Sequence, residues 1–256
     1  MAFMASASAR DLTDRQRDAL DTLVQDLRTI FASRLHALVV YGLGALDGDS
    51  GDDSHLRTLA LVEHVTFDDL AHALPYATEW HRRGLGVPLI LSRHEFARSL
   101  DVFPLEYGNI IANHIVIVGE NPFAGTRVAD ADRRRACEQQ AKSHLIHLRE
   151  GFLETSGDPR HLVQLIARSA PSFGALLANL VRLESGDRLE TESAPLLDRD
   201  ELAAAIERSV GVPASLIIEV LSARADMSTV ADPTALLARY IGASERIWRY
   251  VDGWRP

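Results

Sequence analysis

Residues 37–62 read ALVVYGLGALDGDSGDDSHLRTLALV, so two apolar runs flank an acidic, glycine-containing segment. The first run is rich in Val and Leu and stops at Gly42, a pattern typical of a buried strand that ends in a turn. The middle segment, 47–53, holds four aspartates. The second run, 56–63, is again mostly apolar and predicts another strand. We therefore expect two strands joined by an acidic loop.

Helix start signals surround these strands. Thr13 and Ser92 each precede a Gln or Glu by three residues, which forms a capping box that satisfies backbone N–H groups at a helix start. Thr66 is a further candidate N-cap. With the apolar periodicity that follows each signal, this predicts helices over about 13–33, 66–84 and 92–100, and strands over 87–92 and 114–119.

The helix that follows Thr66 has four apolar residues at helical spacing, namely Leu70, Leu74, Ala77 and Trp80. Residues three and four apart share one face of a helix. This spacing supports the prediction of a helix here.

The second half of the chain has a different character. Asn121-Pro-Phe-Ala-Gly125 breaks the pattern, and beyond it the strand-like runs disappear. We place a domain boundary here, with an α+β domain at 1–125 and a helical-bundle domain at 126–256. The apolar periodicity predicts helices over about 128–156, 159–185, 198–209, 213–224 and 233–252.

Composition narrows the class of protein. A formal net charge of -9 makes a nucleic-acid partner unlikely, because such proteins carry a basic face. The first ten residues lack a basic segment followed by a long apolar core, and no apolar run approaches the roughly 18 residues of a membrane span. We expect a cytoplasmic protein with no membrane partner. Cys137 is the single cysteine, which excludes an internal disulfide and favours a small apolar residue of the core or the surface over a nucleophile.

These patterns resemble the nucleotidyltransferase superfamily, whose palm is similar to that of polymerase beta. Tyr41 and Gly42 lead to Ser54 at the start of the next strand, and Ser-Leu-Asp-Val-Phe-Pro-Leu-Glu follows at 99–106. This order is similar to bacterial nucleotidyltransferase-like proteins, over about residues 35–185. The two-part layout is similar to kanamycin nucleotidyltransferase. The resemblance implies an α+β fold, a nucleotidyltransferase-like mixed sheet with flanking helices, followed by an all-α helical bundle.

The resemblance also implies a chemistry. In an active member a Gly-Ser pair holds the triphosphate, and two carboxylates at alternate positions of one strand hold Mg²⁺. Gly42 matches the glycine, but Leu43 stands in place of Ser, and His55 and Arg57 stand in place of the two acids. A positive charge at Arg57 repels Mg²⁺. We therefore expect a protein that has lost catalysis and uses no metal or other cofactor.

One reading of this arrangement is metal-free binding. Gly42, Gly44, His55 and Arg57 could hold a nucleotide or another small anion, since Arg supplies a planar fork of donors for phosphate or carboxylate. The alternative is that Arg57 pairs with an acid of the 47–53 loop.

Two alternatives remain open. An active Mg²⁺-dependent nucleotidyltransferase would have to draw rearranged carboxylates from Asp52, Asp53 or Glu63, because Mg²⁺ prefers oxygen ligands. A purely structural interaction module would instead bind a protein partner, or form a homodimer, through the helical half. Trp248 and Trp254 near the C-terminus either dock the last helix or contact that partner, and we favour docking.

Overall fold

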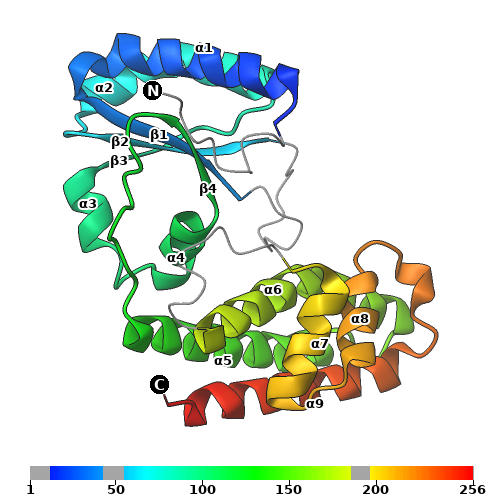
Figure 1. Cartoon of the computed structure of the whole chain (residues 1–256). Helices are drawn as coiled ribbons and strands as arrows, with labels where there is room; N and C mark the ends of the chain where they lie inside the picture. Colours follow the sequence, from blue (N-terminus) through cyan, green and yellow to red (C-terminus); the bar gives the residue numbers. More distant parts are fainter. Residues whose placement is uncertain (1–11, 43–54, 186–196, 256) are drawn as a thin grey trace. The chain divides into compact units, whose positions relative to one another are not determined.

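The computed structural model of the chain describes residues 12–42, 55–185 and 197–255 (Figure 1). These residues form two compact units. The first contains the described residues up to Arg127, and the second begins at Val128. Each unit is described by itself.

The first unit is a four-stranded mixed sheet with helices on both faces (Figure 1). The strand order is β3-β2-β1-β4; β1 is antiparallel to both of its neighbours, whereas β2 and β3 are parallel. This confirms the expected mixed sheet. In chain order its elements are α1 (Asp14–Phe31), the 3-10 turn η2 (Ala32–Arg34), β1 (Leu35–Tyr41), β2 (Arg57–Val62), α2 (Phe67–Arg82), β3 (Leu89–Ser92), α3 (Arg93–Arg98), α4 (Pro104–Ala112) and β4 (His114–Val118).

Local signals set where three of these helices begin. The side chains of Thr13, Thr66 and Ser92 each accept a hydrogen bond from the backbone of the third helical residue, whose side chain bonds back to the cap. All three sites are therefore complete capping boxes, as the sequence predicts for Thr13 and Ser92. Helix α4 was not predicted. It begins with Pro104, which needs no backbone N–H partner at the first helical position.

Both faces of the sheet are buried, which explains why its strands are continuous apolar runs. On one face, Leu38, Val40 and Ala60 belong to a core that includes residues of α1 and α2. On the other face, Val39 and Leu59 belong to a second core that includes residues of α3 and α4. Alternate residues of one strand therefore serve different cores.

The apolar residues of α2 are buried only in part. Trp80 is buried, but Leu70 is 45% and Leu74 is 72% exposed. Polar contacts also join this helix to the rest of the unit. Asp69 is buried and accepts two hydrogen bonds from the Arg34 guanidinium, at 2.6 and 2.9 Å. The Trp80 indole N–H also donates to Asp26 of α1 at 2.9 Å. Apolar spacing alone does not reveal such long-range polar contacts.

The second unit is helical throughout its described residues, which confirms the expected helical region. Its helices pack around α5, α6 and α9, and buried Leu and Ile residues fill the interior. No helix in the part of the chain that the structure describes is both long and apolar enough to cross a membrane. The elements are α5 (Asp130–Glu154), α6 (Pro159–Ser185), α7 (Arg199–Val210), α8 (Ala214–Ser222), η4 (Met227–Thr229) and α9 (Pro233–Gly253).

Side chains of the last helix dock it onto α5. The Lys142 ammonium lies 3.4 Å from the centroid of the Trp248 ring, a cation–π contact between α5 and α9. At the end of α9, Arg134 donates hydrogen bonds to the carbonyl oxygens of Asp252 and Trp254, at 2.8 and 3.2 Å. The Trp248 ring thus takes part in the docking of the last helix within this unit, as expected, whereas the described contact of Trp254 is through its backbone carbonyl.

A buried polar network joins α5, α6 and α9. The Tyr240 hydroxyl lies 2.8 Å from Nε2 of His144, and the Ser172 hydroxyl lies 3.3 Å from Nδ1 of the same ring. The imidazole also stacks on Phe173, at 5.5 Å between ring centroids. Because both ring nitrogens have partners, the network satisfies a histidine that is otherwise enclosed by core.

Candidate functional site

The turn after β1 requires a glycine. Gly42 follows the last residue of β1 and has φ of 69°, in the left-handed region that side chains other than glycine rarely adopt. This glycine directly follows Tyr41. Gly44, the second glycine of the predicted site, lies outside the described residues.

Arg57 is brought to the same end of the sheet. It is the first residue of β2 and pairs with Tyr41 in the antiparallel register, so both side chains project from one face. The Arg57 guanidinium carbon lies 5.5 Å from the centroid of the Tyr41 ring. This cation–π contact orients the guanidinium beside the turn at Gly42.

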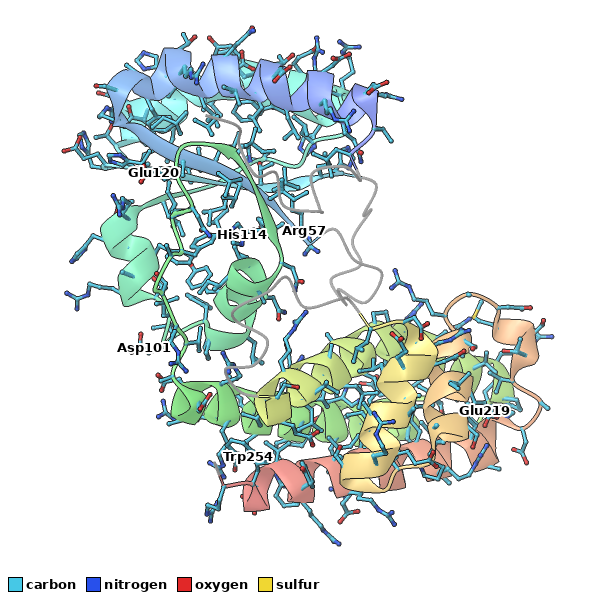
Figure 2. The ribbon with its side chains drawn as sticks, viewed as in Figure 1. Arg57, Asp101, His114, Glu120, Glu219 and Trp254 are labelled. Carbon is cyan, nitrogen blue, oxygen red and sulfur yellow. The ribbon has the colours of Figure 1, made fainter. Side chains whose placement is uncertain are left out.

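His114 completes the row on the other side of β1. It is the first residue of β4 and pairs with Tyr41 as Arg57 does, so the three residues lie side by side across β2, β1 and β4. Figure 2 shows Arg57 and His114 on the side of the sheet that faces away from α1. We call Arg57, Tyr41 and His114 the three-strand row.

His114 contributes to the row as a neutral group. Burial lowers the pKa of His114, although hydrogen bonds with the Ile111 carbonyl and the Asn121 side chain oppose this shift. Its Nδ1 donates to the Ile111 carbonyl oxygen at 3.0 Å, and the ring meets Phe123 edge-on at 4.7 Å. Since the pKa falls below its ordinary value of 6.5, the ring is neutral at pH 7.

Sequence reasoning did not identify His114 or Tyr41 as site residues. The pairing of β4 with β1 joins positions 41 and 114, which are far apart in the chain. The one local signal was a polar residue at the start of an apolar strand, which is common at strand ends and carries no chemistry by itself.

His55 lies near Arg57 in sequence, but its side chain contacts a different element. Its Nε2 donates to the His81 carbonyl oxygen at 3.2 Å, and the two imidazole rings meet edge-on at 5.3 Å. The adjoining backbone is also paired there, because the Leu56 N–H donates to the Gly84 carbonyl at 2.8 Å. These contacts place the His55 ring at the end of α2, whereas the described contact of Arg57 is with β1.

The carboxylates considered for a metal do not converge on this row. Asp52 and Asp53 lie outside the described residues. Glu63 follows the last residue of β2, at the opposite end of that strand from Arg57, and its N–H donates to the Arg34 carbonyl at 2.9 Å. At the rise of a strand this separation is about 20 Å, too far to share one ion. Nowhere in the described residues do three His, Cys, Asp or Glu side chains group so that they could hold a metal.

The residues of the row do not fit Mg²⁺. Where the family resemblance implies an acidic pair, the structure presents a guanidinium beside a phenol ring and a neutral imidazole. Mg²⁺ requires oxygen ligands, usually carboxylates, whereas a guanidinium is a cation without an acceptor atom.

The segment 99–106 joins α3 to α4, and residues on either side of it pack in the core on the same face of the sheet as the row. The Ser99 hydroxyl donates to the Glu95 carbonyl at 2.7 Å, which closes the end of α3. Phe96 and Tyr107 then pack together at 4.8 Å between ring centroids, within the core under β1. Burial raises the pKa of Tyr107, although a hydrogen bond with Ser99 lowers it. This motif therefore links α3 to α4 in the core next to the row.

The chain was compared with known proteins in sequence and in structure. No family model matches the chain, and no curated protein matches it in sequence. Among solved structures, a spectinomycin adenyltransferase from Enterococcus faecialis, with ATP and spectinomycin, is similar over 90% of this chain and 98% of its own. The sequence identity is 12% and the TM-score is 0.49.

Proposed function

We propose that this chain is a nucleotidyltransferase-like protein that has lost the transfer reaction and binds a nucleotide or another small anion. The observation that carries the proposal is the position of Arg57, at the start of β2 and against the ring of Tyr41, beside the left-handed turn at Gly42. The motifs of residues 41–57 and 99–106 and the mixed sheet support the relation to nucleotidyltransferases.

The chemistry of the row supports binding rather than transfer. A transferase of this type must hold metal ions that stabilise the attacking and leaving oxygens of an in-line displacement. Arg57 occupies a position at which the resemblance expects one of the acids. Its guanidinium instead matches the planar oxygens of phosphate or carboxylate through two parallel hydrogen bonds. The contact with the Tyr41 ring already restricts the Arg57 side chain, so less conformational entropy is lost when a ligand binds.

The proposed site keeps Gly42 and Arg57 from the sequence prediction and adds Tyr41 and His114. His55 is tested separately, because its ring is hydrogen-bonded to the end of α2. In this proposal Gly42 shapes the turn, Arg57 supplies the positive charge, and His114 supplies a neutral polar edge.

The test is a thermal-shift titration with ATP, GTP, CTP and UTP in excess EDTA. A ligand that binds only the folded protein raises the melting temperature by mass action. We expect at least one nucleotide to raise it for the wild type and for the His55→Ala variant, but not for Arg57→Gln. Arg17→Gln is the matched control, because Arg17 is an exposed arginine of the same unit that pairs with Asp14. An equal shift in Arg57→Gln and Arg17→Gln would overturn the proposal.

A specific observation favours the interaction module as a second candidate. On α5, Ile146 is 41% and Leu153 is 76% exposed, and seven-residue spacing places them on one side of the helix. Exposed apolar residues on one helix face are typical of protein contacts. If this is the function, the purified chain forms a homodimer that Leu153→Glu disperses, as sedimentation velocity would show, and nucleotides leave the melting temperature unchanged.

A further inference from the structure

We propose that Arg57 takes the role that metal ions have in an active nucleotidyltransferase, so that this site binds phosphate groups free of Mg²⁺ and Mg²⁺ weakens the binding. This inference rests on the proposed function and names its ligand class: a nucleotide or polyphosphate whose terminal phosphate carries no chelated cation. An active transferase behaves in the opposite way, because there the metal joins the phosphates to the protein.

The charge of the row carries the first step. Arg57 is its single cationic member, since Tyr41 is a phenol and the lowered pKa of His114 keeps that ring neutral at pH 7. Chelation of Mg²⁺ removes two negative charges from the phosphate chain. The attraction between the ligand and Arg57 falls accordingly, because the Coulomb energy scales with the product of the two charges.

Coordination chemistry carries the second step. Mg²⁺ bound to phosphate keeps an octahedral shell and completes it with water and usually one or two protein carboxylates. Glu63 lies at the far end of β2, and the described residues contain no metal-binding group of three side chains. The chelated ligand would therefore bring a dication to the guanidinium of Arg57 without gaining carboxylate ligands from the row.

The geometry of the guanidinium carries the third step. The Arg57 guanidinium carbon lies 5.5 Å from the centroid of the Tyr41 ring, a cation–π contact that holds the head group beside β1. The edge of a guanidinium donates two parallel hydrogen bonds to two oxygens of one phosphate. Mg²⁺ chelated to that phosphate competes for the same oxygens. The fork therefore favours the metal-free form, whose phosphate oxygens are not already coordinated to a cation.

The experiment is isothermal titration calorimetry of the full chain with ATP, at constant ionic strength, in excess EDTA and in excess MgCl₂. Inorganic tripolyphosphate forms a second arm, which shows whether the base contributes. We expect Mg²⁺ to raise the Kd for at least one of these ligands by about tenfold, equivalent to about 1.4 kcal/mol. Arg57→Lys keeps the charge without the fork, so it should bind more weakly and still show weakening by Mg²⁺.

The outcomes separate this inference from the function on which it rests. Binding that is equally tight with and without Mg²⁺ overturns the inference and leaves the proposed function standing. Binding that requires Mg²⁺ overturns both, and so does a Kd in EDTA that is unchanged in Arg57→Gln. Circular dichroism melting of each variant shows that it is folded. The sign of the Mg²⁺ effect is a readout that a merely structural role of Arg57 would not produce.

Discussion

Because His144 is buried in the helical unit, we predict that the protein loses stability in mild acid. Burial, reinforced by the nearby His147, lowers the pKa of His144 to about 4 from 6.5. The folded protein therefore resists protonation of this ring, whereas the unfolded chain takes up a proton below about pH 6.5. The contribution of His144 to the free energy of unfolding is complete above pH 6.5 and is lost as the pH falls from 6.5 to about 4.

The magnitude follows from the two pKa values. Each unit of difference corresponds to about 1.4 kcal/mol, so the full shift is worth about 3.4 kcal/mol. At pH 4.5, where protonation of the folded form has begun, linkage gives about 2.5 kcal/mol. Other groups titrate in this range, so the relevant quantity is the difference between the wild type and His144→Gln, which lacks the titrating ring.

The assay is urea unfolding at pH 7.5 and pH 4.5, followed by circular dichroism, for both proteins. We expect the wild type to lose about 2.5 kcal/mol more than His144→Gln between the two values of pH. The variant itself is less stable at pH 7.5, because Tyr240 and Ser172 lose their ring partner. Equal losses in the two proteins would refute the reasoning, since they would show that His144 titrates alike in the folded and unfolded chains.

Three further perturbations have definite expected results. Asp26→Ala should lower the free energy of unfolding by about 1–3 kcal/mol, because it leaves the indole N–H of the buried Trp80 without its acceptor. Asp26→Asn should lower it less, because the amide keeps an acceptor oxygen. Equal losses of stability in urea unfolding would contradict this prediction. Cys137 is fully buried, and burial raises the pKa of its thiol to about 12. It should therefore react with iodoacetamide only as the protein unfolds. Rapid alkylation under native conditions, measured by mass spectrometry, would contradict the fold. Gly42→Ala should destabilise the first unit by about 1 kcal/mol because of the positive φ, and an unchanged melting temperature would argue against that turn.

The parts of the fold that depend on local sequence were predictable. Capping boxes lie within four residues, so Thr13 and Ser92 mark their helices without any knowledge of the tertiary structure. The helices of the second half follow from apolar periodicity, and their observed bounds differ from the expected ones by a few residues at most. Their amphipathic faces repeat over many turns, which makes the pattern strong.

The remainder depends on contacts between distant segments. The ion pair of Asp69 in α2 with Arg34, from the segment before β1, joins positions far apart in the chain, so the sequence does not reveal it. The three-strand row was hidden for the same reason, since it exists only when β4 pairs with β1. Arg57 and Gly42 could be predicted as site residues because the family resemblance aligned both of them with a known motif. His55 aligned equally well, yet its ring lies against His81.

The most direct test of the central claim is an NMR titration that follows the guanidinium Nε–H signal of Arg57, assigned by its loss in Arg57→Gln. ATP is added to the isotopically labelled chain in excess EDTA, and Arg17 provides an internal reference on the same spectrum. We predict that the Arg57 signal shifts with ATP concentration while the Arg17 signal stays in place, because the phosphate accepts hydrogen bonds from the Arg57 fork. An unchanged Arg57 signal at saturating ATP, or shifts confined to other residues, would contradict the account.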